Sequence, residues 1–225
     1  MAFLPPALRR LAAASLLAAV SVAAPLHAAT VELVTNGTFN TGMSSWTVTN
    51  TPNGTTRINT VTSTYDVDGD GLDLNALNLQ VGRSGGTGTG GVTLTQTIVV
   101  PMHMSLTFTA DIMARGGNTS GNLDFGQFSM WFNGTLIDNH AFGAGLRNEA
   151  KRPTLSGLIL AVLPGTYALT VNVQRGYNVS NQTPLQILDD FSVQATIVPL
   201  PASSLLLLGG LAGLGWVRHR RRRVA

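Results

Sequence analysis

The sequence contains no cysteine among its 225 residues, and both charged and aromatic residues are scarce, at 11% and 6%. Without cysteine the chain cannot form disulfide bonds, use a thiol as a nucleophile or bind zinc through thiolates. The 25 glycines and the sparse charge are typical of an extracellular β-protein rather than of a helical enzyme.

The formal net charge of +3 comes from the two ends of the chain. Two of the 14 Lys and Arg residues are Arg9 and Arg10, and five more lie between positions 218 and 223. The seven that remain stand against 11 acidic residues, so the body of the chain carries a formal charge of −4. A basic patch for phosphate groups is not available there, and we expect no nucleic-acid partner.

The first 29 residues have the pattern of a secretory signal. Arg9 and Arg10 precede an apolar stretch from Leu11 to Ala24, and the small residues Ala28 and Ala29 mark a cleavage point. The paired arginines resemble a Tat signal, but the residues around them lack the rest of that pattern. We therefore expect residues 1–29 to be a signal peptide that is exported by the Sec route.

The C-terminal segment has the pattern of a membrane helix. No charge occurs from Ala202 to Val217, a stretch that makes roughly 24 Å of helix at 1.5 Å per residue. This is slightly short of the hydrocarbon core of about 30 Å. Arg218 and the basic residues that follow it favour the cytoplasmic side, because Lys and Arg resist translocation. The pattern predicts a transmembrane helix with the body outside the inner membrane.

A proline-containing motif, a short apolar helix and an arginine cluster follow one another over residues 198–225. This order resembles the PEP-CTERM class of bacterial sorting signals in its VPLPA variant. The resemblance implies transient anchoring in a Gram-negative inner membrane, recognition and cleavage by an exosortase, and export to the cell surface or extracellular matrix, often alongside exopolysaccharide. A plain, uncleaved membrane anchor is the alternative. The motif consists of Val198, Pro199, Leu200, Pro201 and Ala202.

Between the two signals, residues 30–197 alternate between apolar and polar side chains at the period of a strand. The stripe from Leu106 to Ile112 is an example, and Asn133-Gly134 is a hairpin turn. No useful stretch shows the period of a helix. The pattern predicts one all-β domain, a jelly-roll-type antiparallel β-sandwich.

The body opens with Asn36-Gly37-Thr38-Phe39 and then Trp46, and it closes with a strand from Ile187 to Val193. These two ends resemble galactose-binding-like jelly rolls, which include several carbohydrate-binding modules and domains commonly carried by PEP-CTERM proteins. Such modules often have Glu after the Phe, whereas this chain has Asn40. The resemblance implies a structural calcium between the first and last strands. Asp189 or Asp190 would be a ligand of that calcium, unless it only makes hydrogen bonds at the strand end.

The densest group of carboxylates follows the DxDxDG pattern. Alternate carboxylates can converge on one hard cation, and Gly71 permits the sharp turn that such a loop needs. Position twelve is Leu77 instead of the Glu of an EF-hand, so the similarity is to DxDxDG calcium loops in general. The alternative is a solvated acidic turn. The candidate Ca²⁺ ligands are Asp66, Asp68, Asp70 and Asp73.

Two aromatic residues are candidates for sugar stacking. Trp131 alternates with the apolar residues Met130 and Phe132, so its indole points outward if those residues fill the core. An exposed aromatic on a sheet is a stacking platform for a sugar ring. If both faces of the sheet are buried, the indole belongs to the core instead. Tyr177 is the second candidate and is expected in a loop, while Trp46 is expected in the core.

Catalytic motifs are not evident. His103 and His140 lack a Ser or Glu at a catalytic spacing, and neither GxSxG nor HExxH occurs. We expect a non-enzymatic protein with a structural or adhesive role in exopolysaccharide or biofilm, and with a glycan-binding face. A hydrolase acting on matrix polysaccharide is the alternative, using paired carboxylates such as Asp111 and Asp124.

Overall fold

The computed structural model describes residues 30–50, 55–61, 65–72, 75–82, 89–116, 124–176, 184–197 and 209–210, with only the backbone described for 55–61. Thr30–Val198 forms one compact unit. The predicted signal peptide and sorting motif lie outside the described residues, as does the predicted transmembrane helix except for Gly209 and Gly210, which are helical. Within the described part of the chain, no helix has the length and apolar character of a membrane span.

Twelve strands lie in the described residues, and their lengths range from 2 to 13 residues. They are β1 (Thr30–Glu32), β2 (Thr47–Asn50), β3 (Thr55–Val61), β4 (Ala76–Val81), β5 (Thr89–Val100), β6 (Met104–Arg115), β7 (Gln127–Phe132), β8 (Thr135–Ala141), β9 (Ala150–Lys151), β10 (Thr154–Val162), β11 (Gly165–Gly176) and β12 (Leu185–Ile197).

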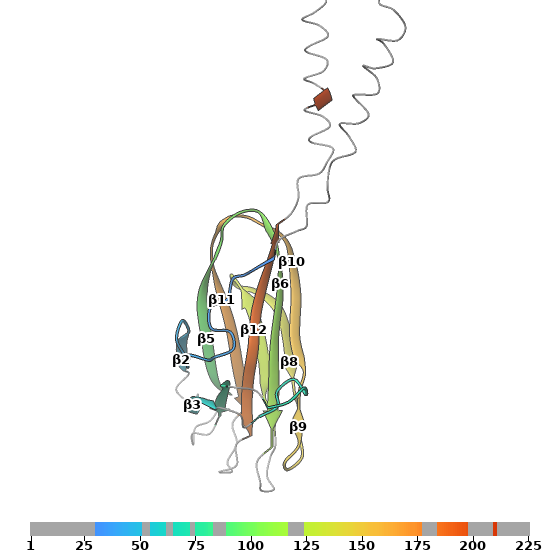
Figure 1. Cartoon of the computed structure of the whole chain (residues 1–225). Coiled ribbons are helices and arrows are strands. Elements are labelled where there is room, and N and C mark those ends of the chain that lie inside the picture. The colour runs from blue at the N-terminus through green and yellow to red at the C-terminus, as the bar shows by residue number, and fades with distance from the viewer. Residues whose placement is uncertain are drawn as a thin grey trace, which may run out of the picture. The chain divides into compact units, whose positions relative to one another are not determined.

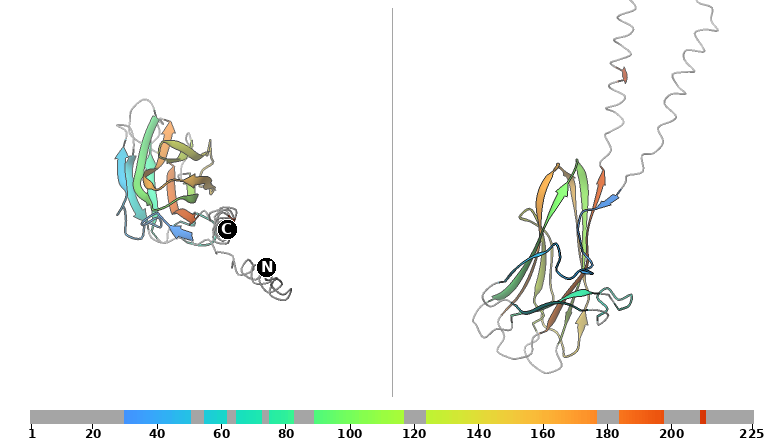
Figure 2. Two further views of the ribbon diagram at one scale, coloured as in Figure 1. Left: turned by 90° about the horizontal axis from the view of Figure 1, so that it is seen from above. Right: turned by 60° about the vertical axis from the view of Figure 1, so that its left-hand side comes forward.

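The strands form two antiparallel sheets that face one another as a β-sandwich (Figures 1 and 2). The seven-stranded sheet has the order β10-β6-β12-β4-β3, with β1 paired to β12 and β9 paired to β6. The five-stranded sheet has the order β2-β5-β11-β7-β8. The connections from β5 to β6 and from β10 to β11 therefore cross from one sheet to the other. The prediction of an all-β antiparallel sandwich is confirmed.

The core fills the space between the sheets because each long strand turns every second side chain inward. On β6 the inward residues run from Leu106 to Ile112, and on β11 they run from Leu169 to Val173. The turn predicted at Asn133-Gly134 is present, with φ of 47° and 79°, which are the two positive values of a type I′ hairpin.

Two features depart from simple alternation and shape the outer face of the seven-stranded sheet. Strand β4 is buried on both sides from Ala76 to Leu79, because part of its outer face lies under the segment Tyr65–Leu72. Strand β12 carries a bulge between Asp189 and Ser192, where Asp190 has a φ of 45°. Bulges re-aim side chains, and this one alters the direction of the Asp190 carboxylate.

Candidate functional site

Two rows of side chains cross the outer face of the five-stranded sheet, following the register of its five strands. Adjacent strands are about 4.8 Å apart, so each row spans about 19 Å. All ten side chains are exposed or half-buried, and we name them together the threonine face. The first row is Thr47, Thr95, Thr170, Trp131 and Leu136; the second is Thr49, Thr93, Asn172, Ser129 and Asn139.

Trp131 is the one aromatic residue of the threonine face. Its strand neighbours Met130 and Phe132 point into the core, so the indole lies on the opposite side of β7 and is half-buried. The indole Nε1 donates a hydrogen bond to Ser129 Oγ at 3.1 Å. This bond ties the ring to the second row and leaves the ring as an apolar platform beside hydroxyl and amide groups.

The threonine face is polar but uncharged, since none of its ten residues is Asp, Glu, Lys or Arg. Its groups are already oriented by one another: Thr93 Oγ1 donates to Asn172 Oδ1 at 2.7 Å. A threonine hydroxyl keeps both a donor and acceptor capacity, and an amide offers two donors and an acceptor. The face can therefore exchange hydrogen bonds in both directions with a ligand that carries many hydroxyls.

A hollow of about 310 Å³ continues the threonine face toward the end of β11. Gln127 and Gln174 border it, and the glycines Gly126, Gly143 and Gly176 open it by having no side chain. Arg175 also lines this hollow and is only 2% exposed. Its Nε donates to the carbonyl oxygen of Asp124.

Burial lowers the pKa of the Arg175 guanidinium, and the neighbouring Asp124 carboxylate acts in the opposite direction. Arg175 and Asp124 thus place two charged groups in the hollow beside the uncharged threonine face.

The structure places Trp46 and Trp131 in different environments, as the sequence predicts. Trp46 is buried between Phe39 and Phe191, with ring centroids 5.8 and 5.5 Å away, and its Nε1 donates to Asn36 O. The prediction of a core position for Trp46 is confirmed. Tyr177 lies outside the described residues.

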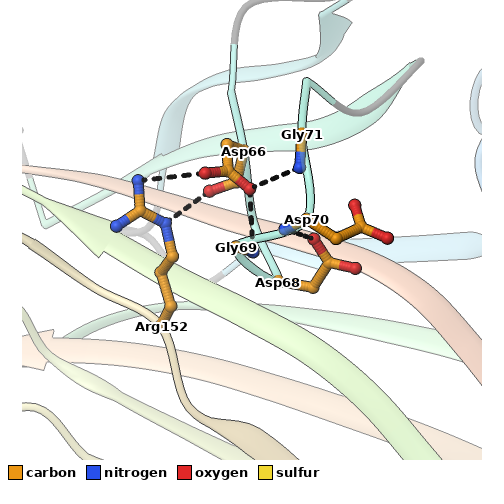
Figure 3. A network of polar contacts seen from close by, with 6 residues as sticks. All are labelled: Asp66, Asp68, Gly69, Asp70, Gly71 and Arg152. Carbon is orange, nitrogen blue, oxygen red and sulfur yellow. Dashed lines mark hydrogen bonds and ion pairs between the residues drawn. The ribbon is translucent and has the colours of Figure 1, made fainter.

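The acidic segment Tyr65–Leu72 folds into a turn in which Asp66 organises the backbone (Figure 3). Asp66 Oδ1 accepts from the N–H groups of Gly69 at 2.7 Å and Gly71 at 3.3 Å, and Asp68 Oδ1 accepts from Asp70 N at 3.0 Å. Arg152 donates to the Asp66 carbonyl oxygen, and its Nη2 lies 3.8 Å from Asp66 Oδ2. Asp66 is thus occupied with shaping the turn and holding Arg152.

Val67 attaches this turn to the seven-stranded sheet. Its buried side chain packs in a small apolar cluster with Ala76, Met113 and Ile187, from β4, β6 and β12. A neighbouring hollow of about 240 Å³ is bordered by Tyr65 and other residues of the turn and of β6. Because Val67 is buried, the adjacent Asp68 is held over the sheet.

Three carboxylates from distant segments converge on the outer face of the seven-stranded sheet. Single oxygen atoms of Asp68, Asp111 and Asp190 all lie within 4.8 Å of one another. Of the candidate loop ligands only Asp68 belongs to this group, while Asp66 faces Arg152 and Asp73 lies outside the described residues. The group therefore combines Asp68 with two residues that lie outside the DxDxDG segment.

Two of the three carboxylates, those of Asp111 and Asp190, border a hollow of about 490 Å³ that also includes Glu32. Asp111 Oδ1 also accepts from Thr154 Oγ1 at 2.6 Å. Asp189, the other acidic residue of the closing strand, is buried, and its Oδ1 accepts from Asp190 N. Carboxylate oxygens at this spacing have the chemistry that Ca²⁺ requires, because hard cations take oxygen ligands.

The structure places the residues considered for catalysis apart from one another. Asp111 lies on β6 of the seven-stranded sheet, whereas Asp124 forms a bridge with Ala144 beside the five-stranded sheet. His103 is exposed in the connection between β5 and β6, and His140 packs edge-on against Phe142. Asp111 and Asp124 do not act together as a carboxylate pair in this arrangement.

No protein-family model and no curated protein matches the sequence. Similar solved structures do occur. TmCBM61, solved in complex with β-1,4-galactotriose, gives a TM-score of 0.46 at 16% identity over 72% of this chain and 97% of that chain. The K1 cleaved adhesin domain of Lys-gingipain from Porphyromonas gingivalis W83 gives 0.45 at 11% identity over 76% of this chain and 99% of that chain.

The enzymatically active domain of bacteriophage CBA120 tailspike protein 4 gives a TM-score of 0.44 at 17% identity, over 74% of this chain and 22% of that chain. The similar structures thus include a protein solved with an oligosaccharide, an adhesin domain and a domain described as enzymatically active. All these TM-scores are below 0.5, so the function of this chain has to be argued from its own residues.

Proposed function

We propose that the chain binds an uncharged polysaccharide along the threonine face. The observation that carries the proposal is the first row, in which a half-exposed indole stands in register with three threonines across four neighbouring strands. A pyranose ring has an apolar C–H face and a rim of hydroxyl groups. Trp131 offers the complementary flat apolar surface, and the threonines offer donors and acceptors for the rim.

The lack of charge on the threonine face favours a neutral polymer over an acidic one. A uronate or sulfate group would be bound best by Arg or Lys, whose charge-assisted hydrogen bonds are about twice as strong as neutral ones. The ten residues of the face supply neither. An acidic glycan would lose hydration on these ten residues, and the guanidinium of Arg175 in the adjoining hollow is buried beside Asp124. We therefore expect binding that tolerates high salt.

Substitution of Trp131 tests this function. Trp131→Ala removes the stacking platform, and we expect retention on a neutral polysaccharide in affinity electrophoresis to fall by about tenfold or more, equivalent to about 1.4 kcal/mol. Trp131→Phe keeps an aromatic face but loses the hydrogen bond to Ser129 Oγ, so it should keep part of the retention. Retention of Trp131→Ala equal to that of the unchanged chain, at an unchanged melting temperature, would refute the assignment.

We further propose that Ca²⁺ occupies the space between Asp68, Asp111 and Asp190 and stabilises the sandwich. The converging carboxylates repel one another when all are ionised, and a divalent cation removes that repulsion. The ion would join the acidic turn to β6 and to the bulge of β12. Its role would be structural, because the ion would lie on the outer face of the seven-stranded sheet, whereas Trp131 belongs to the five-stranded sheet.

Export completes the proposed role. The sequence pattern supports a signal peptide over residues 1–29, a membrane-anchored intermediate in the inner membrane and exosortase processing at Val198–Ala202. The product would be a structural or adhesive component of the cell surface, exopolysaccharide or biofilm matrix. Intact mass of the surface-extracted protein tests this: loss of the residues after the motif supports processing, and their retention supports a plain membrane anchor.

A matrix-polysaccharide hydrolase is the second candidate, and the carboxylates of Asp111 and Asp190 beside the 490 Å³ hollow are the observation in its favour. Paired carboxylates about 5–5.5 Å apart are the machinery of retaining glycosidases. A hydrolase would release reducing sugar from the host exopolysaccharide and lose that activity in Asp111→Asn. A binding protein would sediment with the polymer and release none.

A further inference from the structure

Five large apolar side chains are exposed at one end of the sandwich, each between 46% and 69% exposed. Two lie on the outer face of the seven-stranded sheet in β10, one lies on the outer face of the five-stranded sheet near the end of β5, and two lie in the connections that cross between the sheets. We name this set the apolar end. Its members are Val99, Met102, Leu158, Leu160 and Leu163.

The topology brings these side chains to the same end. Val100 of β5 is opposite Gly165 of β11, and Met104 of β6 is opposite Val162 of β10. The connection from β5 to β6 and the connection from β10 to β11 therefore cross between the sheets side by side, as the arch at the end of the sandwich in Figure 1 shows.

The strands that build the apolar end carry no charge near it. No Asp, Glu, Lys or Arg occurs in Thr89–Ala110 or in Thr154–Gln174. Removing such an uncharged apolar surface from water is favourable. An uncharged end that exposes apolar groups on both outer faces and on the connections between them is typical of a part of the molecule that contacts a protein or a membrane.

Both ends of the folded body leave from this end as well. Thr30 of β1 is opposite Thr196 of β12, and Ile197 is opposite Met104. Figure 1 shows the start of β1 and the end of β12 beside the two crossing connections. After Ile197 only Val198–Pro201 precede the uncharged run Ala202–Val217. Four extended residues reach at most about 14 Å.

We infer that the apolar end rests on the surface of a lipid bilayer while the chain is still attached to it. This inference rests on the membrane attachment proposed above. If the uncharged run is held in the bilayer, a linker of four residues keeps Ile197 within about 14 Å of the lipid. The apolar end lies at the same end of the sandwich as Ile197. Apolar side chains without charge bury favourably at the boundary between headgroups and acyl chains.

A second copy of the chain is a weaker occupant of the apolar end. A standard protein interface uses about 20–30 residues from each side, and the apolar end has five members. The contact with lipid also leaves the proposed glycan site accessible. Thr95, in the first row of the threonine face, is five residues from Val100, a separation of about 17 Å along β5.

Site-directed spin labelling of the full-length chain in phosphatidylcholine vesicles tests the inference, because a protein without cysteine accepts a single label at a chosen position. Leu163→Cys places the label in the apolar end. Leu146→Cys is the matched control, since Leu146 is 74% exposed and its carbonyl oxygen lies against Gly116, which follows the far end of β6 about 40 Å from Met104.

We expect the label at Leu163→Cys to collide less with a water-soluble nickel chelate and more with oxygen than the label at Leu146→Cys, by a factor of several in each case. Vesicle flotation is measured on the same samples. Flotation with equal accessibility at both positions overturns the bilayer contact and leaves the attachment standing. Failure to float overturns both. Spin–spin broadening at Leu163→Cys that grows with protein density overturns it in favour of a second copy.

Discussion

At the scale of single residues, the interior of the sandwich depends on a few amide side chains that satisfy backbone groups. Gln96 accepts from Thr35 N and donates to Thr35 O, both at 2.8 Å, and so fastens the segment before Trp46 to β5. Gln186 is fully buried, accepts from Val81 N and donates to Phe125 O. Each amide pairs one backbone donor and one backbone acceptor, and the two groups that bond Gln186 are buried and would otherwise be unsatisfied.

Gln186→Leu tests this role because it removes both hydrogen bonds at nearly constant volume. The Val81 N–H and Phe125 C=O lose their side-chain partner, at a cost of about 2–4 kcal/mol. For a domain of this size the melting temperature should fall by about 5–10 °C. Gln127→Leu, on the exposed side of β7, is the control and should change stability by less than about 0.5 kcal/mol. Equal effects in differential scanning calorimetry would contradict this role.

Single residues differ in how well the sequence predicts their place. The alternation around Trp131 shows that the indole opposes Met130 and Phe132, but only the structure shows that this side of β7 is not covered. The convergence of Asp68, Asp111 and Asp190 is beyond a local pattern, since β12 must pair with β6 and then bulge before the carboxylates meet. Their proximity arises from the tertiary structure, and no local sequence pattern indicates it.

At the scale of elements, two glycines illustrate two separate reasons for having glycine at a position. One reason is a left-handed backbone, and the other is the lack of space for a side chain. Gly134 has a φ of +79° in the hairpin between β7 and β8, and a Cβ added there meets nothing within 4 Å. Gly126 has a φ of +84°, and a Cβ added there would lie 2.5 Å from Gln174 O. Both positions require the left-handed backbone, and only Gly126 also requires the absence of a side chain.

Alanine at the two positions separates these costs. Gly134→Ala should destabilise the protein by about 1–2 kcal/mol, the cost of a left-handed residue with a Cβ. Gly126→Ala pays that cost and must also push β7 away from β11, so its loss of unfolding free energy should be clearly larger. Urea titration measures both. Equal losses of unfolding free energy would mean that β11 shifts to accommodate the added methyl group without further cost.

The acidic turn Tyr65–Leu72 is the element on which the proposed Ca²⁺ site depends. Asp111→Asn removes one charge from the group of three carboxylates, so we expect Ca²⁺ affinity by isothermal titration calorimetry to fall by at least about tenfold. Asp138→Asn is the control, because Asp138 accepts from Ser156 N and Asn139 N outside that group. Ca²⁺ at 100 times its Kd should stabilise the unchanged chain by about 2.7 kcal/mol.

Absence of heat and of a thermal shift at millimolar Ca²⁺ would reject the site. Equal weakening by Asp111→Asn and Asp138→Asn would reject the assignment to this group of carboxylates and point to bulk charge.

The sequence predicts those strands whose apolar and polar side chains alternate along the strand itself. The strands β6, β7 and β11 follow from alternation, because each has one face in the core. Strand β4 deviates from the alternating pattern, since Val67 and its turn cover the face that would otherwise meet water. The order of strands could not be predicted, because sheet neighbours such as β6 and β12 are far apart in the chain.

At the scale of the whole molecule, Thr30–Val198 holds its own core and sheets. A fragment of residues 30–197 should therefore unfold in one cooperative transition, at the melting temperature of the full-length chain in detergent. Differential scanning calorimetry of the two checks this. A fragment that melts many degrees lower would show that the terminal segments contribute to the fold.

The most direct test of glycan binding on the threonine face is the affinity of the 30–197 fragment for one neutral and one acidic polysaccharide, at low salt and at 1 M NaCl. At 1 M the Debye length is only about 3 Å, so contacts between exposed charges are screened. Binding to the neutral polymer should persist unchanged at high salt and should be lost in Trp131→Ala. Preference for the acidic polymer, or binding that 1 M salt abolishes, would contradict an uncharged, stacking-based site.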